Sequence, residues 1–319
     1  IIGYIMRKDL ISILDLDKTD IFRIFKTAFQ LKEKQKKGVR HFLLEGKTLG
    51  MIFHKPSTRT RVSFEAGMYQ LGGYALFLSS SELQLRRGET IADTARTLSR
   101  YLDGIMIRTY EHQDVQELAA HSSVPVINGL TDREHPCQVL ADTFTIMEKK
   151  KLALDEELSS LREMKVAYVG DGNNVAHSWI HMAARTGLTL SISSPDEYRV
   201  SQEVLKEVGE FRVSVFLTPS PREAVRGADV IYTDVWASMG KEEEKRERLK
   251  VFGAYQVNRE LLSFAPKDCL VMHCLPAHRG EEITNDVMDG EWSVVFDQAE
   301  NRLHVQKAIM LLLMGRDTR

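Results

Sequence analysis

The stretch TLGMIFHKPSTRTRVSFE, residues 48–65, decides how the first part of this chain folds. Its apolar run 49–53 is typical of a buried strand, Pro56 interrupts the pattern, and a helical spacing of apolar residues follows. The first turn of that helix would present unpaired backbone N–H groups and the positive end of the helix dipole. The hydroxyl groups and the guanidinium of S-T-R-T, residues 57–60, stand at the same place. The stretch therefore predicts a site for a phosphate-like dianion.

A simpler interpretation of S-T-R-T stays open at this point. The segment is not a Walker loop, because the glycines and the lysine of that motif are absent. Taken alone, it would more often be a helix N-cap beside a solvated arginine. The anion site therefore depends on what the rest of the chain contributes.

Composition limits the class of protein. The chain has 319 residues, which suggests two domains of ordinary size, and 43% of them are hydrophobic, which is enough for real cores. The net charge of −2 gives no general attraction to nucleic acid or to an anionic membrane, so we expect neither as a partner. The cysteines are odd in number and widely spaced, which argues against a disulfide framework and favours a reducing cytoplasm. No apolar run approaches the roughly 20 residues that a membrane-spanning helix needs.

Short apolar segments alternate with helical patterns twice along the chain. The strands expected in the first half are 48–53, 74–79, 104–108 and 124–128. Those expected in the second half are 166–170, 188–193, 212–217, 230–234, 270–274 and 294–296. The expected helices include 17–36, 60–71, 90–101, 115–120, 136–151 and 302–313, with an exposed helix in the charged run 241–250. This alternation predicts an α/β protein with two doubly wound parallel-sheet domains joined by long helices, and an active site in the cleft between them.

Polar side chains follow the strands, where ligands of open parallel sheets bind. The first half contributes Arg59, Arg108 and His135, which suit an anion and a polarised carbonyl oxygen. The second half contributes groups that suit ammonium and carboxylate ligands, namely Asn174, Asp234, Ser238 and Cys274. This difference predicts two substrates, one held by each domain, and transfer of an acyl-like group from a phosphate to an amine.

Five motifs carry a resemblance to a known family. They are FHKPSTRTRVSFE, HPCQ, DGNN, DVWASMG and HCLPAHRGEE, at 53–65, 135–138, 171–174, 234–240 and 273–282. Across nearly the whole chain, the sequence resembles the ornithine branch of the aspartate/ornithine carbamoyltransferase family. The resemblance implies carbamoyl transfer from carbamoyl phosphate to the δ-amine of L-ornithine, giving L-citrulline and phosphate in arginine biosynthesis, with no cofactor and no metal. It also implies a homo-oligomer, either a trimer or an assembly of trimers.

The resemblance also implies which segments bind each substrate. The carbamoyl-phosphate-binding domain would cover 1–151, with the C-terminal helix 303–319 packing back on it, and the ornithine-binding domain would cover 152–302. The polar stretch 155–163, DEELSSLRE, is the best candidate for a boundary. The carbamoyl phosphate site would comprise Ser57, Thr58, Arg59, Thr60, Gln84, Arg108, His135, Gln138, Cys274, Leu275 and Arg302.

Roles within that site follow from the same resemblance. Residues 57–60 would bind the phosphate, and Arg108 and His135, aided by Thr60, would polarise the carbonyl oxygen. Gln138 and the carbonyl group of Leu275 would hold the carbamoyl nitrogen, and the Leu275–Pro276 bond is expected to be cis. Arg302 would reach the site from the start of the last helix, and Gln84 would enter the site of a neighbouring subunit. The implied catalytic residues are Arg108, His135 and Cys274.

The second substrate has its own implied site. Asn174, Asp234, Ser238 and Met239 would hold the α-amino and α-carboxylate groups of ornithine, with Cys274 near the δ-nitrogen. That amine resembles a lysine, whose pKa is roughly 10.4, so it must lose a proton before it attacks. Desolvation and a nearby thiolate would favour that loss. The loop that contains Met239 and the charged run after it are expected to close over ornithine once carbamoyl phosphate is bound.

Alternative functions fit parts of the sequence. The amine could instead be putrescine or acetylornithine, although Asp234 and Ser238 favour a free amino acid. Gly170 and Gly172 have the G-x-G spacing of a nicotinamide-dependent oxidoreductase, but segment 188–193 ends in serines rather than in an acidic residue for the ribose. A non-catalytic protein of this fold would not need to retain every expected polar site. The cysteines and histidines lack the spacing of a zinc site.

Overall fold

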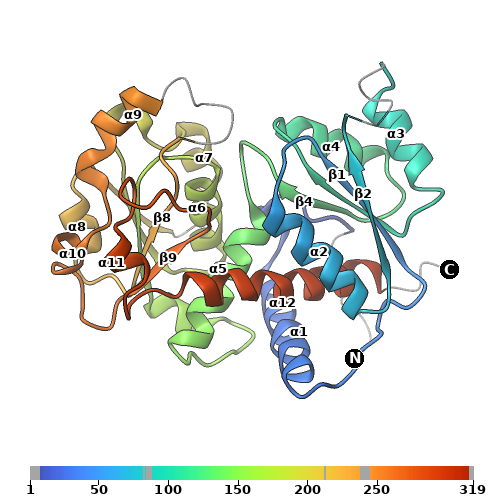
Figure 1. The fold of residues 1–319 in the computed structure, drawn as a ribbon, viewed down its shortest axis with the longest axis horizontal. Coiled ribbons are helices and arrows are strands. Elements are labelled where there is room, and N and C mark those ends of the chain that lie inside the picture. The colour runs from blue at the N-terminus through green and yellow to red at the C-terminus, as the bar shows by residue number, and fades with distance from the viewer. Residues whose placement is uncertain (1–7, 82, 84–87, 212, 238–244, 316–319) are drawn as a thin grey trace. The chain divides into compact units, whose positions relative to one another are not determined.

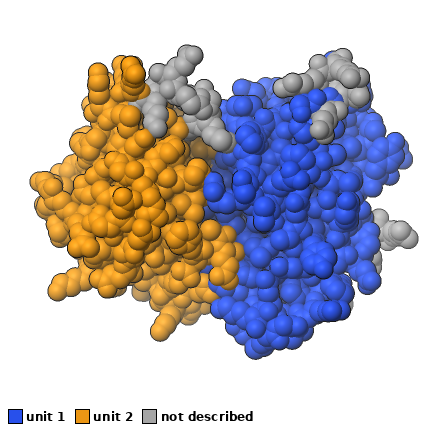
Figure 2. Space-filling model, viewed as in Figure 1, with its two compact units in different colours: residues 1–144, 301–319 blue, residues 145–300 orange. Residues whose placement is uncertain are grey.

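The chain folds into two compact units. The computed structural model describes residues 8–81, 83, 88–211, 213–237 and 245–315. One unit comprises residues 1–144 and 301–319, and the other comprises residues 145–300 (Figure 2). Each unit is built around its own parallel sheet with helices packed on it (Figure 1). The divisions fall inside two long helices, α5 (Pro136–Lys149) and α12 (Val295–Met314).

The first unit has a four-stranded parallel sheet in the order β2-β1-β3-β4. Its strands are β1 (Thr48–Phe53), β2 (Tyr74–Ser79), β3 (Gly104–Arg108) and β4 (Val126–Leu130). Its other helices are α1 (Lys18–Lys36), α2 (Thr58–Gln70), α3 (Ile91–Leu98) and α4 (His112–His121). The first three strands are confirmed at their predicted positions, and β4 begins two residues later than predicted. The parallel register pairs Phe53 with Arg108, so the segments that follow β1 and β3 leave the sheet at the same edge.

A buried apolar layer fixes this arrangement. Residues of β1, β3 and β4 pack with α3 and α4 in one hydrophobic cluster, which includes Ile52, Leu102, Ile105 and Leu118. Gly50 of β1 allows this packing, because a Cβ atom there would lie 2.4 Å from the Leu102 side chain. The core thus anchors the strand ends, from which the polar segments emerge.

The second unit has a five-stranded parallel sheet in the order β7-β6-β5-β8-β9. Its strands are β5 (Lys165–Val169), β6 (Thr189–Ser193), β7 (Ser214–Thr218), β8 (Val230–Thr233) and β9 (Leu270–His273). Its helices are α6 (Asn174–Thr186), α7 (Gln202–Glu207), α8 (Pro221–Val225), α9 (Lys245–Phe252), α10 (Arg259–Leu262) and α11 (Asn285–Met288). All five strands lie within two residues of their predicted positions. Two doubly wound parallel-sheet units are therefore confirmed.

One predicted strand is wrong. Segment 294–296 is not a strand, because α12 begins at Val295, seven residues before the predicted start of the last helix. The error has a physical source, since Val294 and Val295 are buried β-branched residues, which are typical of strands. Val294 does donate its N–H to the Val271 carbonyl oxygen (3.0 Å), but the chain then turns into a helix. Tertiary packing therefore overrides the local preference.

Two further sequence expectations concern surface and membrane. The charged run forms helix α9, but residues 241–244 lie outside the described part of the chain. Arg248 of this helix is buried, although the pattern predicted an exposed helix. Across the described residues, no helix combines the length and hydropathy needed to cross a bilayer.

Candidate functional site

The S-T-R-T turn forms the amino end of helix α2. Ser57 is the N-cap in extended conformation, and its Oγ accepts a hydrogen bond from the Thr60 N–H (3.2 Å). The remaining N–H groups of the first turn have no partner within the helix, and they form the positive end of the helix dipole. Thr58 is exposed and Arg59 is half-buried at this turn, whereas Thr60 is fully buried. The simpler N-cap interpretation is therefore correct for Ser57, and it is compatible with an anion site.

Three cationic or potentially cationic side chains gather near this turn. Arg302 of α12 donates from Nη2 to Thr60 Oγ1 (2.8 Å), which ties the start of the last helix to the turn. Arg108 ends β3, His135 immediately precedes α5, and both are buried. Burial, Arg302 and Arg108 together lower the pKa of His135 well below its usual value of 6.5. The imidazole is therefore neutral near pH 7 and retains one N–H donor beside two guanidinium groups.

Gln138 in the first turn of α5 has a fixed orientation. Its amide Nε2 donates to Asp142 Oδ1 (2.8 Å), so its amide oxygen must point the other way. That buried oxygen, Oε1, has no hydrogen-bond partner within the described residues. An unsatisfied buried acceptor is destabilising unless a ligand donates to it. Gln138 therefore suits a ligand that carries an N–H or O–H donor.

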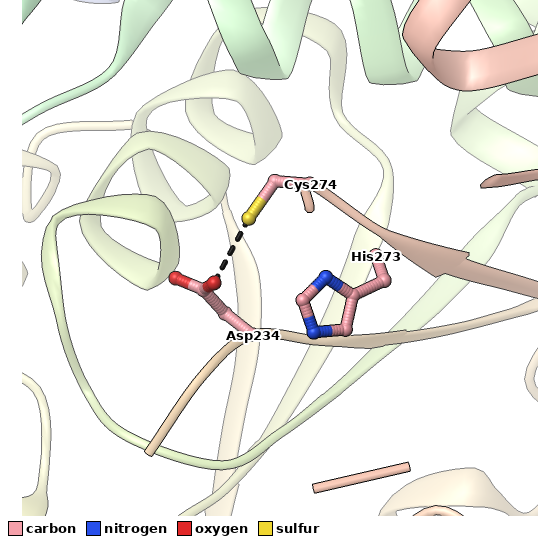
Figure 3. Close-up of side chains that lie close together, drawn as sticks. All are labelled: Asp234, His273 and Cys274. Carbon is pink, nitrogen blue, oxygen red and sulfur yellow. Dashed lines mark hydrogen bonds between the residues drawn. The ribbon is translucent and has the colours of Figure 1, made fainter. Parts of the chain in front are cut away.

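The second unit holds a different kind of cluster. Asn173 is the N-cap of α6 and donates from Nδ2 to Asp234 Oδ2 (2.8 Å). Asp234 Oδ1 accepts from the Cys274 thiol (2.9 Å) and from the Val235 N–H (2.8 Å). Figure 3 shows Cys274, which follows β9, directed at the carboxylate that follows β8. Asn174, which the sequence favoured as a ligand, is half-buried at the first position of α6.

The hydrogen bond to Asp234 indicates whether Cys274 is a thiol or a thiolate. Its sulfur donates to a carboxylate, and a thiolate at this position would place two negative charges 2.9 Å apart. The geometry therefore favours a protonated thiol over the thiolate that the sequence allowed. Cys137 is also a thiol, because burial raises its pKa to about 12.

The sequence missed two residues at this site. Asn173 orients Asp234, and its position directly before a helical pattern is the usual signature of an N-cap. Arg248 of α9 is buried, and it donates to Asp171 Oδ2 (2.7 Å) and to the Trp236 carbonyl oxygen (2.6 Å). It thereby joins the loop after β5 to the segment after β8. No local pattern marks Arg248, since its partners are 77 and 12 residues away along the chain.

The ligand-like atoms of Asp234, His273 and Cys274 lie within 4.8 Å of one another (Figure 3). Both ring nitrogens of His273 are nevertheless engaged. The Leu275 N–H donates to Nδ1 (2.8 Å), and Nε2 bonds to Glu282 Oε1 (3.0 Å). A metal ion could use His273 only by breaking one of these buried hydrogen bonds, so the group is poorly suited to zinc.

The segment after β9 has an unusual backbone. The Leu275–Pro276 bond is cis, which confirms the prediction. Leu275 has a φ of +59°, in the left-handed region that costs a residue with a side chain about 1–3 kcal/mol. Such a conformation persists only where neighbouring contacts hold it. The remaining site residues from the sequence, Gln84, Ser238 and Met239, lie outside the described residues.

The fold is a two-unit α/β protein, with a candidate anion site in one unit and a hydrogen-bonded carboxylate–thiol cluster in the other. Two family models match the chain. The carbamoyl-P binding domain of aspartate/ornithine carbamoyltransferase matches residues 8–148, and its Asp/Orn binding domain matches residues 162–313. The chain belongs to the aspartate/ornithine carbamoyltransferase family.

Individual relatives agree with this placement. The chain is 58% identical over 310 residues to an ornithine carbamoyltransferase of Syntrophus aciditrophicus, covering 97% of this chain and 100% of the relative. It is 54% identical over 312 residues to an ornithine carbamoyltransferase of Pyrococcus furiosus that is named anabolic, covering 97% and 96%. A solved structure of ornithine carbamoyltransferase from Pyrococcus furiosus superposes with a TM-score of 0.90 at 53% identity, covering 99% of each chain.

Proposed function

We infer that this chain transfers the carbamoyl group of carbamoyl phosphate to the δ-amine of L-ornithine, giving L-citrulline and phosphate. The observation that carries this function is the buried cluster of Arg108, His135 and Arg302 beside the amino end of α2. Arg108 and His135 lie within the residues that match the carbamoyl-P binding model, and Arg302 belongs to the same compact unit. Relatives named ornithine carbamoyltransferase match almost the whole chain, which supports ornithine as the amine.

The first unit would hold carbamoyl phosphate. The phosphate would bind at residues 57–60, to the N–H groups of the first helical turn, the hydroxyl groups and the Arg59 guanidinium. Arg302 positions Thr60 and adds a positive charge there. The amide oxygen of Gln138, which has no hydrogen-bond partner among the described residues, would accept from the carbamoyl NH₂. Gln84 and the Leu275 carbonyl group are proposed as further contacts on the strength of the resemblance alone.

Arg108 and His135 would act on the carbonyl oxygen. The amine nitrogen forms a bond to the carbonyl carbon, negative charge grows on the carbonyl oxygen, and the bond to the phosphate oxygen then breaks. The amine loses a proton, and phosphate leaves with the electron pair. A guanidinium and a neutral imidazole N–H stabilise the charged oxygen without needing to reorganise, an effect that is worth on the order of 100-fold per donor. We propose no cofactor, because the amine attacks directly.

The second unit would hold ornithine. Asp234 carries a carboxylate for the ammonium group, and Asn174, Ser238 and Met239 are proposed as further contacts. Cys274 would lie near the attacking nitrogen as a thiol bonded to Asp234. With these roles, residues 1–151 and 303–319 would be the carbamoyl-phosphate-binding part and residues 152–302 the ornithine-binding part. That both sites face one cleft stays a prediction.

Assembly and location are proposed more coarsely. The family resemblance supports a homotrimer or an assembly of trimers, which light scattering would test. The cysteine usage supports a reducing cytoplasm, and none of Cys137, Cys269 and Cys274 forms a disulfide within the described residues.

A steady-state assay tests the proposed function. The protein would be given carbamoyl phosphate with ornithine, aspartate, putrescine or acetylornithine at matched concentrations. We expect citrulline from ornithine, with a kcat/KM at least about 100-fold above that for the other amines, because buried polar groups reject ligands that leave them unpaired. A higher kcat/KM with another amine would reassign the substrate. No transfer to any amine would refute the enzyme assignment.

A further inference from the structure

A tight turn between β9 and α11 brings a histidine and two glutamates together. The Glu281 N–H donates to the His278 carbonyl oxygen (2.9 Å), and Gly280 has a φ of +89°, as a type II turn requires at its third residue. The turn places the first and fourth residues side by side, and Glu282 follows directly. One nitrogen or carboxylate oxygen from each of the three side chains lies within 4.8 Å of the others. We call His278, Glu281 and Glu282 the turn cluster.

Glu282 uses only one of its two carboxylate oxygens in hydrogen bonds. The residue is 0% exposed, and its Oε1 accepts from His273 Nε2 (3.0 Å) and from the His278 N–H (2.5 Å). His273 donates from Nε2 because its Nδ1 accepts from the Leu275 N–H. The other carboxylate oxygen, Oε2, is buried and has no hydrogen-bond partner within the described residues. A buried carboxylate oxygen in this state is destabilising unless a ligand binds to it.

The ring of His278 faces that oxygen without bonding to it. Its Nδ1 lies 3.9 Å from Glu282 Oε2 and 3.7 Å from Glu281 Oε2, and both distances are longer than a hydrogen bond. Nδ1 is buried and, among the described residues, has no hydrogen-bond partner either. Atoms that bind one tetrahedral ion at about 2.1 Å are about 3.4 Å from one another. Small side-chain rotations would therefore bring these atoms to the spacing of metal ligands.

The charge and chemistry of the turn cluster suit a divalent cation. Two carboxylates and a neutral imidazole carry two negative charges, which such an ion would balance. Arg279, which lies within the same turn, is already paired with both carboxylate oxygens of Asp289 (2.5 and 2.8 Å). A single water molecule has two hydrogens, so it could not donate to three acceptor atoms at once. Imidazole combined with carboxylates favours Zn²⁺ over Mg²⁺, which prefers oxygen ligands alone.

We propose that His278 Nδ1, Glu281 Oε2 and Glu282 Oε2 bind a divalent transition-metal ion such as Zn²⁺. Water would complete its coordination, because the side chain of His278 is 41% exposed. The hydrogen bond from His273 would orient the Glu282 carboxylate, as outer-shell partners of metal ligands commonly do. The ion fastens the turn to the end of β9 and takes no part in carbamoyl transfer. This inference therefore does not rest on the proposed function.

Zinc titration of the whole chain tests this site. The protein would be treated with EDTA, returned to metal-free buffer and titrated with Zn²⁺ or Mg²⁺ by calorimetry. We expect one Zn²⁺ per chain to bind through the turn cluster, and Mg²⁺ to bind more weakly. Glu281→Gln and His278→Gln should each weaken zinc binding by at least about 10- to 100-fold, the usual effect of losing even an outer-shell partner. Both side chains are partly exposed, and the melting temperature of each metal-free variant checks that it is folded.

Two control variants separate the turn cluster from other places where zinc could bind. Glu260→Gln removes an exposed carboxylate that is paired with Arg222 in the same unit, and it should leave this zinc affinity unchanged. Cys274→Ala removes the thiol from the group that Asp234 and His273 complete, and it should also leave the affinity unchanged. Co²⁺ gives a spectroscopic check, because a thiolate ligand adds a charge-transfer band that nitrogen and oxygen ligands do not produce.

Several results would overturn the proposal. Zinc affinity that stays the same in both Glu281→Gln and His278→Gln, or that is abolished by Cys274→Ala, would refute the turn cluster as the site. A proton on Nδ1 of His278 in the zinc-saturated protein, detected by nitrogen NMR, would refute it too, since a protonated nitrogen cannot bind a metal. The citrulline assay is independent of these results. A protein that makes citrulline but binds no zinc would refute this inference alone, whereas one that binds zinc here but makes no citrulline would refute only the proposed function.

Discussion

The two units differ in the groups that each would offer to a polar ligand. In the first unit, burial together with the nearby Arg302 and Arg108 lowers the pKa of His135, so a neutral imidazole lies near two guanidinium groups. In the second unit, Asn173, Asp234 and Cys274 already satisfy one another's hydrogen bonds. The first site combines guanidinium groups with the amino end of a helix, which are donors that suit an anion. The second is prearranged, and its ligand must share a carboxylate that is already in use.

This difference suggests an order of binding. An anion in the first unit would be attracted by guanidinium groups and by the amino end of a helix, which is favourable without any other partner. Asp234 already accepts three hydrogen bonds out of roughly four positions on a carboxylate, so ornithine gains less there on its own. We therefore expect carbamoyl phosphate to bind first, as the predicted closing loop also suggests.

The largest effect should come from removing a charge from the first unit. In Arg108→Gln we expect kcat to fall about 100-fold or more, because a donor to the developing oxyanion is lost. The melting temperature of the variant, measured without ligand, shows whether the fold is retained. Arg96→Gln removes an exposed arginine paired with Asp93 and is the matched control, with kcat unchanged. A normal kcat in Arg108→Gln would show that the Arg108 guanidinium does not stabilise the transition state.

The second-largest expected effect concerns how much each ligand stabilises the protein against unfolding. Phosphate alone at about 100 times its dissociation constant should stabilise the unmodified protein by about 2.7 kcal/mol. Arg302→Gln should abolish most of that shift in melting temperature, since Arg302 both supplies charge and holds Thr60. Ornithine alone should produce a much smaller shift than ornithine added with a carbamoyl phosphate analogue. Equal shifts would contradict ordered binding.

The prearranged site predicts a smaller and more selective effect. Cys274→Ala removes the donor to Asp234 and should weaken ornithine binding by about three- to tenfold. Cys274→Ser restores an O–H donor and should fall closer to the unmodified protein. The comparison is made on the KM for ornithine at saturating carbamoyl phosphate. A higher KM for ornithine in Cys274→Ser than in Cys274→Ala would show that sulfur chemistry, rather than hydrogen bonding, determines the role of Cys274.

The same contrast explains what could be predicted from sequence. The first site is built from short contiguous motifs at strand ends, so S-T-R-T, Arg108 and the HPCQ segment could be found by pattern. The strands were also accessible, because buried parallel strands are short apolar runs between turn residues. Among the predicted strands, segment 294–296 is wrong, because the β-branched Val294 and Val295 are buried at the start of a helix.

The parts that escaped prediction depend on distant contacts. Arg248 was expected on an exposed helix, yet it is buried against Asp171, 77 residues earlier in the chain. His273 and Glu282 lie inside one motif, but their buried hydrogen bond depends on how the segment after β9 folds. The sequence pattern favours Asn174 as the ligand, although the position of Asn173 directly before a helical pattern predicts its role as N-cap. Local patterns place such residues on elements, whereas their roles come from packing.

The smallest expected effect concerns pH and separates His135 from an ordinary histidine. Burial and the two arginines lower its pKa well below 6.5, so it stays neutral in the folded protein as pH falls through 6.5. In the unfolded chain the same residue takes up a proton there. The contribution of His135 to stability is thus fully present above pH 6.5 and declines as pH is lowered toward the folded-state pKa.

This pH dependence is measurable by comparing His135→Asn with the unmodified protein. The difference between their free energies of unfolding should change below pH 6.5 by at most about 1.4 kcal/mol per pH unit, and it should be constant above. The affinity for phosphate, measured in parallel, should show no step at pH 6.5 that His135→Asn removes. Such a step would mean that the imidazole gains a proton when the anion binds. The first unit would then bind a proton together with its anion, whereas the second unit would keep the hydrogen bonds that Asp234 already makes.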